Sequence, residues 1–278
     1  MIISRLAHAG PAVRIGALRT RMFTSLVLLG LIAIGLPVAA GATPTAVTLK
    51  LRGVPIAVNP EAVRGPTYPG TGDTLGAGVS VEGEIKISGS EYGGFPPPLT
   101  GVTFLAPARV KLHPQGFATC SEAILESHEV AHCPKKSFAS SIGSVAGVVS
   151  FGATRVHEAL TLQGFFAPGG ELAFYAEGRS PAVIEVMAKA GITSGGGGFG
   201  PKFSTNVPLV ETVPGAPYAV VETAKLTVGA AFMQAGKLIS YITLPKKCPR
   251  GGFPVRAELT FLIGEPVTVD AKMPCPTK

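Results

Sequence analysis

Short β-strand patterns recur about every ten residues along most of this chain, and glycine or proline separates one from the next. Apolar and polar side chains alternate most regularly in Val79–Ile87, as they do in a strand with one buried face. The 36 glycines and 25 prolines among 278 residues punctuate short strands and disfavour long helices. We therefore predict an all-β fold, an antiparallel β-sandwich, rather than helices alternating with a parallel sheet.

The N-terminus has the pattern of an export signal. Four arginines and no acid precede the apolar segment Met22–Leu36, and Ala40 and Ala42 follow at the spacing of a cleavage site. We predict that residues 1–42 are a signal peptide and that residues 43–278 form an exported β-sandwich domain, secreted or at the cell surface. The alternative is that Met22–Ala40 is retained as a membrane anchor, because its 19 residues are just within the length of a spanning helix.

The cysteines fit an exported chain. All four, Cys120, Cys133, Cys248 and Cys275, follow the leader, and an even number outside the cytoplasm indicates two disulfides. Four cysteines allow three pairings, of which we predict the one between sequence neighbours, Cys120–Cys133 and Cys248–Cys275. Each loop closure stabilises the fold by roughly 3 kcal/mol when chain entropy alone is considered.

The C-terminal part of the chain supports the second pair. Three strand patterns lie there, Leu238–Leu244, Val255–Ile263 and Pro266–Val269, with turn residues between them. In an antiparallel meander the end of the third strand lies beside the end of the first. That arrangement would bring Cys275 next to Cys248.

One helix is predicted, over Ser121–Val130, between Cys120 and Cys133. Its first residue suits the N-cap position, and a glutamate follows in the first turn. Ser180–Gly191 fits a helix or a strand, and its β-branched residues and strand neighbours favour the strand. Val207–Val213 is predicted to continue the series of strands.

The sharpest motif match is His128-Glu129-Val130-Ala131-His132. On a helix, H-E-x-x-H places both imidazoles on one face for zinc, and the glutamate can activate a bound water. The motif therefore raises the hypothesis of a zinc-dependent hydrolase that uses His128, Glu129 and His132.

Two observations count against a zinc site. The positions that would carry Gly and His in the metzincin pattern are Lys135 and Phe138, and the candidate third ligand Glu158 lies in a strand pattern. A continuous helix from Cys120 to Cys133 would also separate these residues by about 20 Å, whereas a disulfide needs Cα atoms within about 7 Å. We therefore predict no catalytic residues, no metal site and no cofactor, and expect the protein not to be an enzyme.

Other function classes receive little support. The chain has no G-x-S-x-G element, and its aspartates, Asp73 and Asp270, limit Ser-His-Asp and calcium-loop patterns. It has no Trp and only 5 Tyr to offer as platforms for sugars. Without the four leader arginines, 20 bases remain against 17 acids, and this net charge of +3 does not indicate nucleic acid.

Several segments between about Gly70 and Cys275 together resemble a group of exported bacterial β-sandwich proteins of uncharacterised function, which carry paired Cys-Pro motifs. These segments are Pro96–Phe104, Thr119–Cys120, Cys133–Pro134 and Cys248–Pro254. The resemblance implies export and no particular activity, and the H-E-x-x-H motif is not a feature of the group. We accordingly predict a non-catalytic role at the cell surface or outside the cell. The alternative is a carbohydrate- or protein-binding module whose partner is a cell-wall or extracellular glycan or protein.

Overall fold

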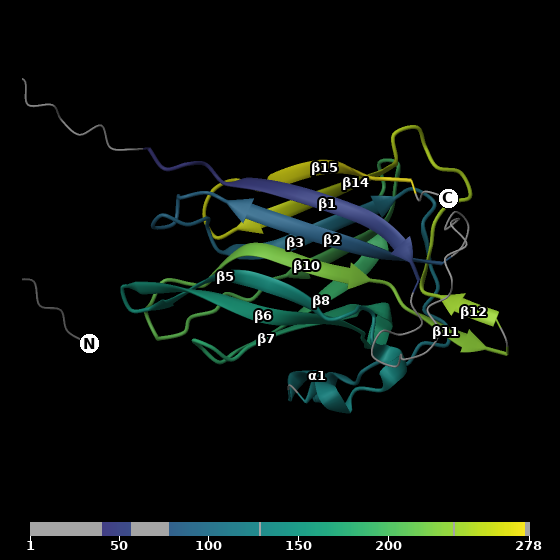
Figure 1. Ribbon diagram of the computed structural model, residues 1–278, viewed down its shortest axis with the longest axis horizontal. Coiled ribbons are helices and arrows are strands. Elements are labelled where there is room, and N and C mark those ends of the chain that lie inside the picture. Colours follow the sequence, from purple (N-terminus) through teal and green to yellow (C-terminus); the bar gives the residue numbers. More distant parts are fainter. Residues whose placement is uncertain (1–40, 57–77, 128, 236, 276–278) are drawn as a thin grey trace, which may run out of the picture. The chain divides into compact units, whose positions relative to one another are not determined.

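A computed structural model describes residues 41–56, 78–127, 129–235 and 237–275. They belong to one compact unit, and 11 strands form a single antiparallel sheet (Figure 1). The strands are joined in the order β1-β2-β10-β5-β6-β7-β8-β9-β3-β14-β15. Their bounds are β1 Ala46–Pro55, β2 Val79–Ser88, β3 Leu99–Pro107, β5 Gly143–Phe151, β6 Thr154–Phe166, β7 Leu172–Gly178, β8 Ile184–Ser194, β9 Phe199–Asn206, β10 Val220–Val228, β14 Phe253–Phe261 and β15 Val267–Met273.

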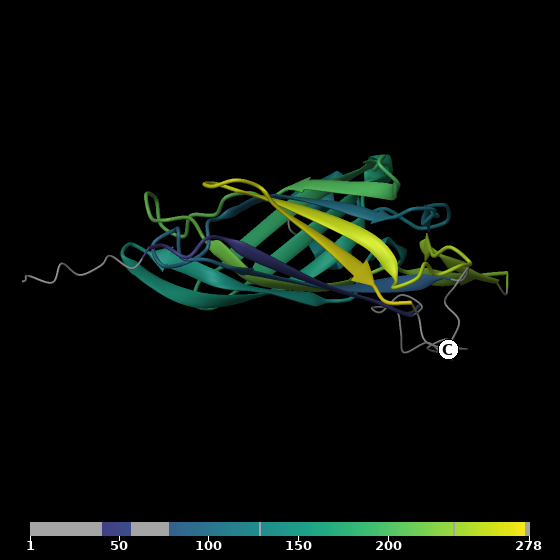
Figure 2. The same cartoon turned by 90° about the horizontal axis from the view of Figure 1, so that it is seen from above.

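The sheet curls until its two edge strands, β1 and β15, lie side by side. The view turned by 90° shows the strands in two layers (Figure 2). The two layers expected of a sandwich are thus parts of one nearly closed sheet. The predicted all-β, antiparallel architecture is confirmed.

The alternation in β2 decides which side chains enter the interior. Val81 and Ile85 face inward, and Glu82 and Glu84 lie on the outer surface. Neighbouring strands supply cations to these acids: the Arg52 Nε donates to Glu82 Oε2 at 3.1 Å. Such cross-strand pairs contribute little individually, but they keep the polar face of the strand in solvent.

Two long connections close one end of the sheet. These connections, from β3 to β5 and from β10 to β14, carry all the short elements given below except η3, which lies between β6 and β7. Phe117 and Tyr241 of the connections pack with Phe166 at the end of β6, and the Phe166 and Tyr241 centroids are 4.6 Å apart. Burial raises the pKa of Tyr241 to about 12. The short elements are β4 Lys111–Leu112, α1 Glu122–Glu126, η1 Val130–His132, η2 Lys135–Ser137, η3 Pro168–Gly170, β11 Ala231–Gln234, β12 Lys237–Ser240 and β13 Ile242–Thr243.

Helix α1 lies on the outer face of the sheet (Figure 1). Leu125 is fully buried in a cluster with Phe165 and Ala173 of the strands beneath it. Glu122 forms an ion pair with Lys189 of β8, and this hydrogen bond raises the pKa of the Lys189 ammonium. The helix is one turn shorter at its C-terminal end than the sequence pattern suggests, because the chain turns back toward the first disulfide.

The C-terminal meander differs from the prediction. β12 pairs with β11, and β13 pairs with β4, so the segment Leu238–Leu244 does not join the main sheet. Cys248 and Cys275 approach each other for another reason: β14 and β15 form a hairpin in which Phe253 lies opposite Met273. Both cysteines lie just beyond the open end of that hairpin.

Two further strand assignments were decided by local context. Ser180–Gly191 becomes β8 for most of its length, as favoured above. Val207–Val213 is not a strand, and that prediction was wrong: Val207 donates the last hydrogen bond to Thr100, and Pro208 has no N–H to continue the ladder. The strand of this region is β9, which precedes it and which the sequence pattern did not reveal.

Within the ranges described, no helix is both long enough and apolar enough to cross a membrane. The predicted signal peptide, residues 1–42, lies outside these ranges except for its last two residues.

Candidate functional site

The interior of the sheet contains a cavity of about 420 Å³. Inward-facing side chains of both layers form its wall, among them Leu160 of β6, Val186 of β8 and Phe203 of β9. Of the described residues that line it, only Glu158 and Thr205 have polar side chains. The cavity therefore offers an apolar environment with very few hydrogen-bonding groups.

Small residues at inward positions leave this space open. Gly83 on β2, Ala176 on β7, Ala188 on β8 and Ala224 on β10 all line the cavity. Leucine or phenylalanine at these positions would fill much of it. Protein interiors are normally packed as tightly as organic crystals, so a void of this size is a structural feature rather than ordinary looseness.

The two ends of the cavity are built differently. One end is closed by the aromatic packing around Phe166 and Tyr241, together with the buried Leu244. At the other end, where β9 leaves the sheet and β10 begins, the loop of residues 207–219 contributes Val210 and Ala219 to the lining.

The loop of residues 207–219 is held by a small number of hydrogen bonds. The Ala219 N–H donates to the Val210 carbonyl at 2.9 Å, and the Tyr218 N–H donates to the Tyr92 hydroxyl at 3.0 Å. The Thr212 hydroxyl also donates to a carbonyl at the end of β5. This loop covers the cavity without being part of the main sheet.

Among the described residues of the wall, Glu158 is the one charged group. It lies on β6, near the end covered by the loop, and only 3% of its surface is exposed. Its Oε2 accepts a hydrogen bond from the Ala182 N–H at 3.0 Å. Within the described part of the chain, Oε1 has no hydrogen-bond partner.

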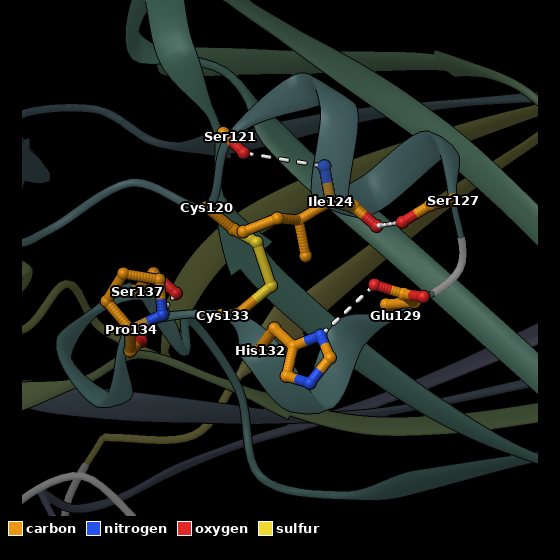
Figure 3. Close-up of a disulfide and its surroundings, with 9 residues drawn as sticks. All are labelled: Cys120, Ser121, Ile124, Ser127, Glu129, His132, Cys133, Pro134 and Ser137. Carbon is orange, nitrogen blue, oxygen red and sulfur yellow. Dashed lines mark hydrogen bonds and ion pairs between the residues drawn. A yellow bond between two sulfur atoms is a disulfide. The ribbon is translucent and has the colours of Figure 1, made fainter.

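Both predicted disulfides are present. Cys120 and Cys133 have Cα atoms 5.0 Å apart, and Cys248 and Cys275 have Cα atoms 5.9 Å apart. The first pair requires the chain between its cysteines to reverse direction (Figure 3). α1 accordingly ends at Glu126, and η1 carries the chain back to Cys133.

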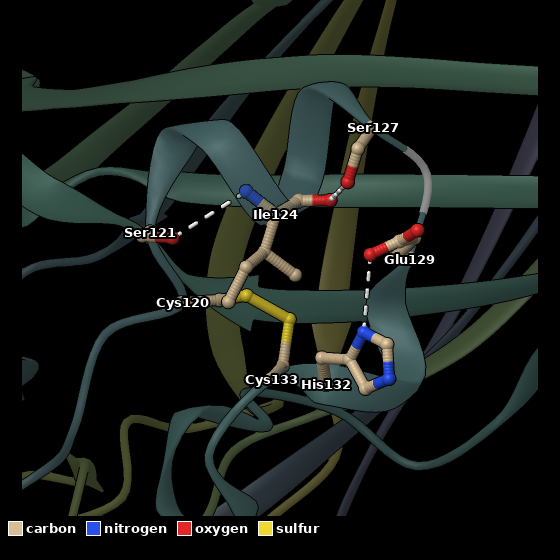
Figure 4. Close-up of polar contacts among 7 residues, drawn as sticks. All are labelled: Cys120, Ser121, Ile124, Ser127, Glu129, His132 and Cys133. Carbon is tan, nitrogen blue, oxygen red and sulfur yellow. Dashed lines mark hydrogen bonds and ion pairs between the residues drawn. A yellow bond between two sulfur atoms is a disulfide. The ribbon is translucent and has the colours of Figure 1, made fainter.

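This reversal interrupts the H-E-x-x-H segment. Glu129 stands before η1 with non-helical backbone angles, φ −85° and ψ 48°, and His132 lies in η1. Their side chains are exposed and contact each other, with His132 Nδ1 3.1 Å from Glu129 Oε2 (Figure 4). His128 lies outside the described residues. Glu129 and His132 therefore do not share the continuous helix that the motif needs.

The candidate third zinc ligand is not part of this region. Glu158 faces the interior of the sheet, whereas the Cys120–Cys133 segment packs against the outer face, on Phe165 and Tyr175. No group of three or more His, Cys, Asp or Glu side chains in the described ranges is arranged to hold a metal ion.

The sequence does contain a signal for the role of Glu158 in the cavity. Glu158, Leu160 and Leu162 occupy alternate positions of one strand, so an acid shares the register of two leucines that face the interior. An acid at an inward position is informative, because a buried carboxyl group is costly unless it has a partner.

Comparisons of this chain with protein-family models, with curated proteins and with solved structures gave no match.

Proposed function

We propose that this protein is an exported, non-catalytic binding protein that holds a small apolar molecule inside its sheet. The observation that carries the proposal is the cavity of about 420 Å³ with an almost entirely apolar wall. Small-molecule sites have volumes of about 300–1,000 Å³ and are lined mostly by apolar side chains. Transfer of an apolar ligand from water into such a wall is favourable because it removes apolar surface from water.

The same wall favours an apolar ligand over the other partners considered. A carbohydrate needs many hydrogen-bonding groups around it, and the described residues of the wall include only two polar side chains. A protein partner would bind an outer surface and would not require an open interior. The two disulfides support a role outside the cytoplasm, where such bonds persist.

Filling the cavity is expected to weaken binding of an apolar probe. Diphenylhexatriene is dark in water and fluoresces in apolar surroundings, so the purified protein should increase its emission saturably. Ala176→Phe places a ring at an inward position between Leu162 and Val186, and we expect it to weaken probe binding by roughly tenfold or more.

Ala159→Phe is the matched control. Ala159 follows Glu158 in β6, but its side chain is exposed on the outer face of the sheet. A ring there should therefore leave probe affinity unchanged. Equal loss in both variants, or no saturable emission with the unaltered protein, would contradict the proposal. Circular dichroism of each variant checks that the fold is retained.

The zinc hypothesis is tested by metal content and by one substitution. Because Glu129 and His132 are exposed, paired with each other and separated from Glu158, we expect less than one zinc per chain in protein made in an oxidising compartment. We also expect no peptidase activity that Glu129→Gln removes. One tightly bound zinc per chain, together with a hydrolysis lost in that variant, would establish the enzyme instead.

A further inference from the structure

Glu158 is a carboxyl group in a wall made otherwise of apolar side chains and one threonine. Burial of an ionised carboxylate without a partner costs several kcal/mol, even after a protein relaxes around it. No cation of the described chain forms an ion pair with Glu158, and its single hydrogen bond comes from the Ala182 N–H. A group so costly to bury points to a partner that the described part of the chain does not supply.

The surroundings of Glu158 leave its second oxygen without a polar neighbour in the described part of the chain. Gly178 ends β7 beside it, and a Cβ at that position would lie only 2.8 Å from Oε1 and 3.0 Å from the Leu160 side chain. A glycine there leaves room for the carboxyl group. The Ala182 N–H fixes the other oxygen at 3.0 Å, so the orientation of the carboxylate is set before any ligand enters.

We propose that the molecule held in the cavity is an amphiphile with an apolar body and one hydrogen-bond donor, an amine or a hydroxyl group, which donates to Oε1 of Glu158. This inference rests on the proposed apolar binding function and names the polar end of its ligand. The donor supplies the partner that Oε1 lacks, and the apolar body occupies the space bounded by Leu160, Val186 and Phe203.

The chemistry of the carboxylate orders the ligands. A carboxyl group that pairs with an amine does so as carboxylate and ammonium, and such charge-assisted hydrogen bonds are stronger than those with a neutral donor. Of three ligands of equal size, an alkyl amine should bind best, an alcohol next and an alkane least. An alkyl carboxylate should be disfavoured further, because two adjacent carboxyl groups cannot both ionise without repulsion.

The test is displacement of diphenylhexatriene by octylamine, octanol and nonane, which have equal numbers of non-hydrogen atoms and differ at one end. We expect octylamine and octanol to displace the probe from the unaltered protein at roughly tenfold lower concentrations than nonane. Octanoate should require a higher concentration than nonane.

Two substitutions assign this preference to Glu158. Glu158→Met has an unbranched side chain of similar length with no oxygen. It should remove or reverse the preference for octylamine and octanol over nonane, because a buried donor would then have no acceptor. Glu158→Gln keeps an acceptor but cannot form an ion pair with an ammonium group. The advantage of octylamine should therefore fall, while octanol should still displace the probe at a lower concentration than nonane. Nonane binding reports in each variant whether the cavity itself is intact.

The outcomes are separable. A preference for the donors in the unaltered protein that disappears in Glu158→Met supports the assignment. Equal displacement by octylamine, octanol and nonane overturns it, and leaves the apolar binding function standing. Failure of nonane and of the probe to bind at all overturns the binding function itself.

Discussion

Replacing Cys248 and Cys275 with serine is expected to lower the free energy of unfolding by roughly 3.5 kcal/mol, because this disulfide closes the longer of the two loops. The cysteines are 27 residues apart, compared with 13 for Cys120 and Cys133, and unfolded-chain entropy rises with loop length. Denaturant unfolding followed by circular dichroism measures the change. The same substitution of Cys120 and Cys133 should cost roughly 3 kcal/mol.

Reductant provides the internal control for these variants. Reduction of the unaltered protein should cost more than either pair of substitutions, and reduction of the Cys248/Cys275 variant should remove only the contribution of the remaining bond. A variant whose unfolding midpoint matches that of the oxidised protein would show that the hairpin of β14 and β15 holds this corner without its disulfide.

Gly147→Ala is expected to destabilise the fold by roughly 3 kcal/mol, because the added methyl group has no room. A Cβ at Gly147 would lie 2.0 Å from the Val220 carbonyl oxygen and 3.3 Å from the Val221 Cα, both of them backbone atoms of β10. Neither can rotate away as a side chain would, so the β5–β10 pairing has to shift. The pairing is already irregular there, with a change of register after Val221.

Gly191→Ala is the matched comparison, since Gly191 also lies within a strand, β8, and a Cβ there meets no atom within 4 Å. Alanine has a smaller entropic cost of folding than glycine, so this variant should be as stable as the unaltered protein or slightly more stable. Thermal and denaturant unfolding are measured for both variants. The difference between them reports the clash of the added Cβ with β10, as distinct from the general effect of replacing a glycine in a strand. Equal stabilities would show that β10 moves freely away from β5.

Local patterns predicted the strands better than their partners. The alternation of Val79–Ile87 identified β2 and its buried face, and the short distance that a disulfide requires excluded one continuous helix from Cys120 to Cys133. The Cys248–Cys275 pair was predicted from a meander that does not form, and the correct neighbours are β14 and β15. The leader and export remain predictions.

Sequence patterns could not predict the cavity, and the reason is physical. Its wall combines strands that are distant in the chain, and strand order depends on non-local pairing that no single segment specifies. Glu158 was noticed for zinc chemistry, because the H-E-x-x-H motif drew attention to nearby acids. Its position on the inner face of β6, beside Gly178 at the end of β7, becomes clear only when the inward register of β6 and its pairing with β7 are both known.

The neighbouring positions of β1 and β15 in space have a consequence for how fast this protein folds. These strands come from opposite ends of the described chain, and β3 pairs with β9 and with β14, so many native contacts join residues far apart in sequence. Chains of such high contact order fold slowly, on a scale of milliseconds to seconds or longer, because loop entropy is lost before the contacts form. β1 emerges first during synthesis or translocation, but its place beside β15 exists only after the last strand has arrived. The sheet therefore closes after the whole chain is available, and an exported chain of this topology would complete its fold on the far side of the membrane.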